Sequence, residues 1–200
     1  MTFTRRTFVA TGLASGLATA LPLRAFAHTE QSAEDWVVPE EFLPRPVRFS
    51  EPQAPGALIV DPDYFALYHV LTERRGMQYS VGVGRGNLYE SGAFTVGAKK
   101  EWPSWTPTDD MIARDPDHYA KWADGMPGGP KNPLGARALY LFDDAGGDTF
   151  LRIHGTPEPW TIGSAVSNGC VRLANQDIAE LYDLVELGAP VLLLPKVQSA

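Results

Sequence analysis

Short apolar runs separated by turn residues dominate the chain from Ala57 onward. Residues 57–61 form an apolar run that ends at an Asp-Pro pair, and residues 64–71 are rich in aromatic and branched side chains. Residues 77–84 alternate in a similar way after an Arg-Gly turn. Runs of this length and composition, bounded by Gly, Pro and Asp, are typical of β-strands. They predict a hairpin-rich, mainly β first half of the domain.

The second half repeats this pattern and adds one helix. Residues 137–142 and 149–154 flank the Asp- and Gly-rich turn 143–148, which predicts a hairpin. Asn175 is expected to cap a helix that runs to about Leu187, because apolar residues recur there at helical spacing and Gly188 follows. Residues 191–194 predict a closing buried strand. Together, residues 57–196 indicate one mainly β domain with minor helices.

Two segments lack this regularity. Residues 28–56 are rich in proline, which predicts an extended lead-in that covers the domain or, equally, a flexible tether. Residues 108–131 are expected to hold one or two short helical turns before a Gly- and Pro-rich break, as in a lid or binding loop. His118 lies there among aspartates, but a solvated helix face explains these charges better than a metal site, since no ligand spacing is evident.

Residues 1–27 have the composition of a twin-arginine-type signal peptide. Arg5 and Arg6 precede the uncharged stretch 9–23 and an Ala-Phe-Ala end at Ala27. A membrane anchor is the alternative, but the apolar part is shorter than the ~20 residues that a span needs. We therefore expect cleavage after Ala27, export to the periplasm or cell envelope, and no stable membrane span afterwards.

The charge balance excludes one class of partner. Removal of residues 1–27 would take away three arginines and leave 14 basic against 24 acidic residues, a net charge of −10. Such a chain gains nothing from a phosphate backbone, so we expect no binding to nucleic acid. A hydrophobic content of 44% fits one globular domain.

Cys170 is the only cysteine in the chain. It cannot form an internal disulfide, so it is either a buried, inert side chain or a reactive one. A thiol attacks a carbonyl carbon as the thiolate, and an imidazole is the usual device for lowering its pKa from ~8.5. His154 is the candidate imidazole. His154 follows the short apolar segment 150–153 and Cys170 begins the segment 170–173, and each of the two residues has a glycine beside it. Cys170 and His154 are the predicted catalytic pair.

The order and spacing of these residues closely resemble the L,D-transpeptidase (YkuD-like) catalytic domain family. The matching stretches are His154-Gly155-Thr156, Ile162-Gly163 and Ser167-x-Gly169-Cys170-Val171-Arg172-Leu173. Asn168 departs from the commonest family form, which has histidine or lysine there. A looser likeness includes residues 92–107 and the Asn-Pro-x-Gly passage at Asn132. The resemblance implies a YkuD-like β-sandwich with minor helices over residues 57–196.

It also implies cysteine acyl transfer on peptidoglycan stem peptides. Cys170 would attack a tetrapeptide donor, and an amine acceptor would complete a 3-3 cross-link or attach an outer-membrane lipoprotein, with neither metal nor organic cofactor. Gly169, Ser167 and Gly155 would stabilise the oxyanion or orient the site. Arg172 would hold a substrate carboxylate. Trp102 and Trp105 either line the substrate cleft or pin their proline-rich loop to the domain.

Other functions stay open on the sequence. Water as the acceptor would make the protein an L,D-carboxypeptidase, and an unreactive Cys170 would leave a cell-wall binding module. A cysteine peptidase of unrelated fold would need an Asn or Asp to orient the histidine. No residue of this kind can be placed in the sequence. A backbone carbonyl is therefore the alternative group that would orient His154.

Overall fold

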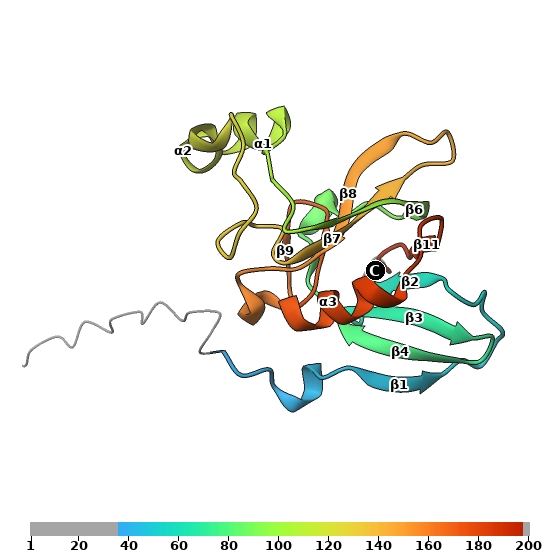
Figure 1. Ribbon diagram of the computed structural model, residues 1–200. Helices are drawn as coiled ribbons and strands as arrows, with labels where there is room; N and C mark the ends of the chain where they lie inside the picture. The colour runs from blue at the N-terminus through green and yellow to red at the C-terminus, as the bar shows by residue number, and fades with distance from the viewer. Residues whose placement is uncertain (1–35, 198–200) are drawn as a thin grey trace, which may run out of the picture. The chain divides into compact units, whose positions relative to one another are not determined.

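The computed structural model describes residues 36–197, so the expected signal peptide lies outside the described part of the chain. Its strands are β1 (Arg45–Arg48), β2 (Leu58–Asp61), β3 (Ala66–Thr72), β4 (Arg75–Ser80), β5 (Val83–Gly84), β6 (Gly92–Glu101), β7 (Arg137–Phe142), β8 (Asp148–His154), β9 (Ala165–Ser167), β10 (Val171–Arg172) and β11 (Pro190–Leu193). Its α-helices are α1 (Asp109–Arg114), α2 (Pro116–Tyr119) and α3 (Asn175–Leu184), and Figure 1 shows their arrangement.

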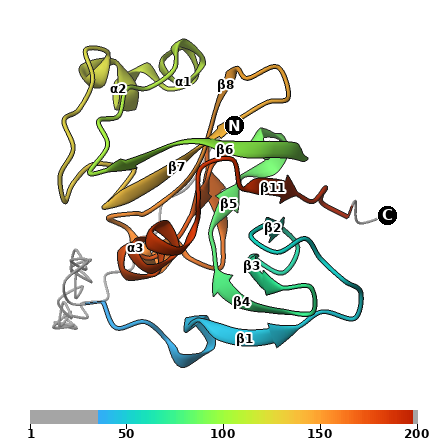
Figure 2. The same cartoon turned by 45° about the vertical axis from the view of Figure 1, so that its right-hand side comes forward.

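One large sheet forms the frame of the domain. Its nine strands follow the order β1-β4-β3-β2-β11-β6-β7-β8-β10, and β5 pairs with β9 in a separate small sheet. Most neighbours are antiparallel, but β2–β11 and β8–β10 are parallel. Gly82 exchanges two backbone hydrogen bonds with Arg172, of 2.9 and 2.8 Å, and so connects the last strand of the sheet back to the segment after β4. In Figure 2 the two halves of the sheet, β1–β4 and β6–β8, lie opposite each other.

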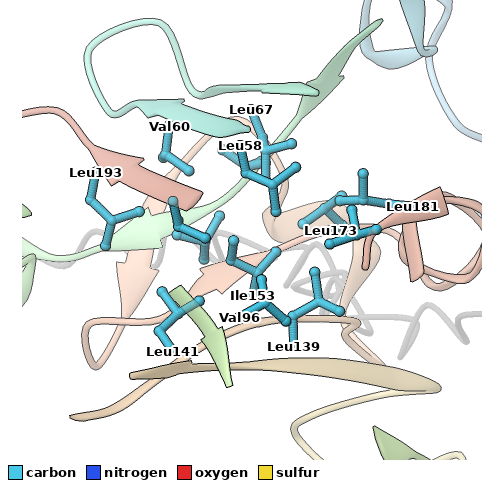
Figure 3. Close-up of a cluster of buried hydrophobic side chains, with 14 of the residues drawn as sticks. Leu58, Val60, Leu67, Val96, Leu139, Leu141, Ile153, Leu173, Leu181 and Leu193 are labelled. Carbon is cyan, nitrogen blue, oxygen red and sulfur yellow. The ribbon is translucent and has the colours of Figure 1, made fainter. Parts of the chain in front are cut away.

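The hydrophobic core fills the space between these halves. Leu58, Val60 and Leu67 from β2 and β3 meet Val96, Leu139, Leu141 and Ile153 from β6, β7 and β8 (Figure 3). Helix α3 adds Ile178 and Leu181, both with no exposed surface. The prediction of a mainly β sandwich with minor helices is thus confirmed, as is the hairpin formed by β7 and β8.

Helix α3 differs from the prediction at both ends. Asn175 is its first residue and not its cap, since Ala174 holds the cap position without a side-chain hydrogen bond. The Asn175 Oδ1 atom instead accepts a hydrogen bond of 2.9 Å from the Ala136 amide, which connects the helix to the chain before β7. The helix ends at Leu184, before the predicted Leu187. The Asn175 side chain, which the local pattern assigns to capping, is therefore used in a tertiary contact.

The sequence pattern did not identify β1 and β6. β1 lies within the proline-rich lead-in, where it pairs with β4 as the edge strand of the sheet. Pro46 is tolerated there because an edge strand leaves some N–H groups unpaired. β6 is a ten-residue strand that contains Gly97. This glycine weakens the strand signal, yet a Cβ at this position would lie 2.2 Å from the Phe142 ring.

The segment between β6 and β7 contains the two expected helical turns, α1 and α2. The residues predicted to face inward, Met111, Ile112, Tyr119 and Trp122, are half-buried, whereas most of their neighbours are exposed. Thr108 caps α1 by accepting the Met111 amide at 3.3 Å, and Asp115 caps α2 by accepting the His118 amide at 3.2 Å. We call residues 108–131 the helical insert. Within residues 36–197, no helix has both the length and the apolar character needed to cross a membrane.

Candidate active site

The sheet brings His154, the last residue of β8, beside β10, which Cys170 directly precedes. In the parallel pair β8–β10, Val171 lies opposite Ile153 and Arg172 lies opposite His154. Val171 and Ile153 point into the core. Because side chains alternate along a strand, Cys170, Arg172 and His154 share the opposite face. Cys170 is offset from the level of His154 by two residues, or about 6.6 Å along the strand.

His154 is held in one orientation by the main chain. Its side chain is buried, and its Nδ1–H donates a hydrogen bond of 2.5 Å to the carbonyl oxygen of Gly155. A carbonyl can only accept, so this bond places the ring proton on Nδ1 and leaves Nε2 as the acceptor. Burial, and next the positive charge of Arg172, lower the pKa of His154 to about 3. The imidazole is therefore neutral at physiological pH and oriented without a carboxylate.

Cys170 is a half-buried free thiol. Its Sγ lies 3.8 Å from the carbonyl oxygen of Phe150, and no hydrogen bond joins it to His154 in the described structure. Burial raises the pKa of Cys170, although the Arg152 amide and the charges of Arg152 and Arg172 oppose this effect. Thiol and imidazole are thus both neutral near pH 7, so proton transfer must accompany the attack by sulfur.

This arrangement predicts the pH dependence of thiol alkylation. The pKa of Cys170 is raised, and the lowered pKa of His154 prevents the imidazole from holding the thiol proton as a stable imidazolium. The rate of reaction with iodoacetamide should therefore rise about tenfold per pH unit from pH 6 to 8, as the thiolate fraction rises. The chain has one cysteine, so mass spectrometry of the intact protein measures this rate directly. A rate that is already constant between pH 5 and 7 would instead reveal a preformed thiolate–imidazolium pair.

Ser167 shapes the loop that carries the thiol. Its hydroxyl donates a hydrogen bond of 2.5 Å to the Cys170 carbonyl and accepts one of 3.2 Å from the Gly169 amide. Gly169 has φ +128°, a conformation that L side chains rarely adopt, and a Cβ there would lie 3.0 Å from the Leu88 carbonyl. The ladder between β8 and β10 begins only at Val171, which leaves the Cys170 amide outside it.

Gly155 supports the histidine through close packing. A Cβ at this position would lie 2.2 Å from Asn175 Oδ1 and 3.1 Å from both the Ala136 amide nitrogen and an Ile178 methyl group. The Gly155 carbonyl that orients His154 is therefore fixed by contact with α3 and the chain before β7.

We predict that Gly155→Ala lowers the free energy of unfolding by about 1–3 kcal/mol because the added methyl overpacks this contact. For a domain of this size, the melting temperature should fall by about 3–10 °C. Calorimetry of the variant checks this. Gly129→Ala is the matched control, since a Cβ at Gly129 would meet nothing within 4 Å and should leave the melting temperature nearly unchanged.

Arginines surround the thiol and the imidazole, and three of them are paired with carboxylates. Arg172 lies 3.3 Å from Glu158, and Arg152 binds Asp148 through two contacts of 2.6 and 2.8 Å. Farther along the sheet, Arg137 lies 3.2 Å from Glu101. The buried Nε of Arg172 has no hydrogen-bond partner among the described residues. Strand alternation places Arg172 on the face of Cys170, and Glu158, which the sequence pattern did not single out, already engages its Nη1.

The two predicted tryptophans differ in their surroundings. Trp105 exchanges backbone hydrogen bonds of 2.9 and 2.6 Å with Met126, and its ring centroid lies 6.2 Å from that of Tyr119. These contacts join Trp105 to the helical insert, and its two expected roles, lining the substrate cleft and pinning its loop to the domain, stay predictions. Trp102 is 45% exposed at the end of β6, with φ 40°. Its ring is accessible to a ligand, so a role in substrate binding stays a prediction.

Asn168 connects the thiol-bearing loop to two other segments. Its Oδ1 accepts hydrogen bonds from Arg85 at 3.2 Å and from Arg114 at 3.0 Å, and its Nδ2 donates one of 2.8 Å to the Tyr119 hydroxyl. Arg114 and Tyr119 belong to the helical insert, and Arg85 directly follows β5. No local pattern predicts these contacts, because the residues are 49 to 83 positions apart. The described residues contain no cluster of His, Cys, Asp and Glu that could hold a metal ion.

A thiol and an oriented neutral imidazole on neighbouring strands define a cysteine–histidine site in a mainly β fold. Residues 55–193 match the family model YkuD, the L,D-transpeptidase catalytic domain. The chain belongs to this family. The resemblance drawn from the residues around His154 and Cys170 is thereby confirmed, while the roles of the individual side chains stay predictions.

Comparisons with individual proteins agree with this membership. The chain is 30% identical over 172 residues to the "Probable L,D-transpeptidase ErfK/SrfK" of Escherichia coli K12, covering 82% of this chain and 50% of that protein. The chain therefore spans about half the length of this curated relative. A crystal structure from Brucella melitensis, described as a "Probable carnitine operon oxidoreductase caia", shares 47% identity and a TM-score of 0.54, with 81% of this chain and 99% of that one covered. L,D-transpeptidase 3 of Mycobacterium tuberculosis shares the fold at 18% identity and a TM-score of 0.51, with coverage of 70% and 60%.

Proposed function

We propose that this protein is a peptidoglycan L,D-transpeptidase that transfers an acyl group through Cys170. One observation carries the proposal: the sole thiol of the chain shares a sheet face with a buried imidazole whose Nδ1 is bound to the Gly155 carbonyl. This orientation leaves Nε2 free to take the thiol proton. Family membership supports the choice of substrate, a tetrapeptide stem whose third residue is a diaminopimelate.

In the first step, Cys170 Sγ attacks the carbonyl carbon of the diaminopimelate residue. His154 accepts the thiol proton as the sulfur–carbon bond forms, and then gives it to the nitrogen of the departing D-alanine as the carbon–nitrogen bond breaks. The product of this step is a thioester on Cys170. A neutral starting pair suits this path, because the charged imidazolium exists only while the oxyanion is present.

Backbone amides would stabilise that oxyanion. The amide of Cys170 lies outside the sheet ladder and follows a glycine with φ +128°, a backbone conformation that helps set the direction of this N–H group. Ser167 bonds the Gly169 amide and the Cys170 carbonyl, which belong to the peptide groups on either side of this one, so its role is to orient the loop. When His154 takes the thiol proton it becomes an imidazolium. The negative oxyanion of the intermediate that precedes the thioester would stabilise this charge, in place of a protein carboxylate.

In the second step, an amine attacks the thioester carbon and His154 takes the amine proton. His154 then returns this proton to the Cys170 sulfur as the carbon–sulfur bond breaks, which restores the free thiol. A stem-peptide amine would give a 3-3 cross-link, a lipoprotein lysine would give an anchored lipoprotein, and water would give a shortened stem. These reactions share the acyl-enzyme and differ only in the acceptor. The acceptor, and export of the protein to the periplasm or cell envelope by residues 1–27, remain parts of the proposal.

Incubation of the purified chain with a disaccharide tetrapeptide tests this function. We expect release of D-alanine together with a dimer of donor and acceptor stems, both resolved by liquid chromatography and mass spectrometry. Release of D-alanine without a dimer would favour the carboxypeptidase or a different acceptor. Binding of the peptide without any turnover would favour the non-catalytic cell-wall binding module.

A further inference from the structure

Two arginines meet at Asn168, which precedes the thiol-bearing Cys170 by two residues in the chain. Arg85 and Arg114 both donate to the same Asn168 oxygen, at 3.2 and 3.0 Å, so their contacting nitrogens lie within about 6 Å of each other. An amide oxygen carries no formal charge and cannot neutralise two guanidinium groups. Lys196 adds a third cation nearby, because its Nζ donates to the carbonyls of Gly84 and Gly86 on both sides of Arg85, at 2.8 and 3.1 Å.

Arg85 and Arg114 differ from the other arginines around the site because they lack a carboxylate partner among the described residues. Arg137, Arg152 and Arg172 each have a carboxylate within 3.3 Å. Within residues 36–197, no carboxylate lies within 4.0 Å of Arg85 or Arg114. Glu90 is near enough to Cys170 to raise the pKa of the thiol, but it too lies beyond this distance from both guanidinium groups. The pair therefore offers two charged donors to an anion from outside the protein.

The position of the Arg85–Arg114 pair relative to Cys170 suggests which anion the pair binds. Asn168 precedes Cys170 by two residues, and the Gly169 between them is held against the Leu88 carbonyl. Arg172, already paired with Glu158, follows Cys170 on the other side. In the donor, the terminal carboxylate lies one residue beyond the carbonyl that the thiol attacks. One residue thus separates this carboxylate from the reacting carbon in the donor, and one residue, Gly169, separates Asn168 from Cys170 in the chain.

We propose that Arg85 and Arg114, held together by Asn168, bind the terminal carboxylate of the acyl donor. This assignment rests on the proposed function and adds to it a recognition site for the leaving residue. Arg114 and the Tyr119 hydroxyl belong to the helical insert, so this insert supplies part of the substrate site. Guanidinium groups suit the task because their planar donors match a carboxylate.

The test compares two donors that differ only in this group: the tetrapeptide with a free terminal carboxylate, and the same peptide ending in D-alaninamide. Both are assayed with a fixed acceptor for release of the terminal residue. We expect the wild-type chain to prefer the carboxylate donor. Arg85→Gln and Arg114→Gln should each lower kcat/KM for that donor about 10- to 100-fold, mainly through KM, and change kcat/KM for the amide donor less than about threefold. Arg114→Lys should restore part of the preference.

Arg48→Gln is the matched control, since it removes the same charge from the exposed edge strand β1. It should leave the preference intact. An equal loss for both donors in Arg85→Gln and Arg114→Gln would show that these residues only fix the insert, which overturns the assignment. In a second assay with the donor fixed and the acceptor free or amidated, a loss that depends on amidation of the acceptor, and not of the donor, would also overturn it. If the wild-type chain turned over neither donor, the proposed function itself would fail.

Discussion

Cys170→Ala should abolish release of D-alanine from the tetrapeptide donor, with a loss in kcat/KM on the order of 10⁴-fold or more. The alanine removes the sulfur that forms the thioester, and no other cysteine in the chain can replace it. The measurement is a coupled assay for free D-alanine on the purified variant.

Two further measurements make this result specific. The variant should keep the melting temperature of the wild type within a few degrees, because the hydrogen bond of the thiol to the Phe150 carbonyl is long, at 3.8 Å. It should also still bind the tetrapeptide, as measured by calorimetry. Unchanged turnover in a folded Cys170→Ala protein would show that the chemistry lies elsewhere.

His154→Gln should lower kcat/KM at pH 7 by about 10²- to 10⁴-fold, the usual contribution of a general base. Glutamine keeps a side-chain donor that can reach the Gly155 carbonyl, but it cannot take the thiol proton. The physical reason is the raised pKa of Cys170, which leaves little thiolate at pH 7 without a base. Steady-state kinetics with the tetrapeptide donor measures the loss.

The pH profile separates a lost base from a damaged fold. Without His154, the reaction depends on free thiolate, so activity of His154→Gln should rise about tenfold per unit between pH 7 and 9 and the deficit against the wild type should narrow. A merely distorted site would show a deficit of the same size at every pH. A loss of less than a few-fold at pH 7 would remove His154 from the mechanism.

Local patterns predicted the strands that carry the site. The turn at 143–148 fixes the hairpin β7–β8, and the apolar alternation through Ile153 sets which face His154 occupies. The spacing from His154 to Cys170 then indicated the family. These features follow from neighbours in the sequence, so pattern and turn chemistry are enough to find them.

Features that depend on distant contacts were not accessible in this way. The histidine is oriented by the Gly155 carbonyl, and a carbonyl has no residue type that sequence could reveal. Asn175 fits a helix cap locally, yet its Oδ1 binds the Ala136 amide. The cluster of Arg85, Arg114 and Asn168 joins three segments that only the folded chain brings together. In each case, tertiary structure decides between partners that local pattern leaves open.

The most direct test of the account is to observe the acyl-enzyme itself. The chain is mixed with the disaccharide tetrapeptide in the absence of added acceptor, quenched in acid within the first turnovers, and analysed by intact-mass and peptide mass spectrometry. We predict a mass increase equal to the donor minus D-alanine, located on the peptide that contains Cys170 and reversed by hydroxylamine. Turnover of the donor without such an adduct, or an adduct on another residue, would contradict a thioester on Cys170.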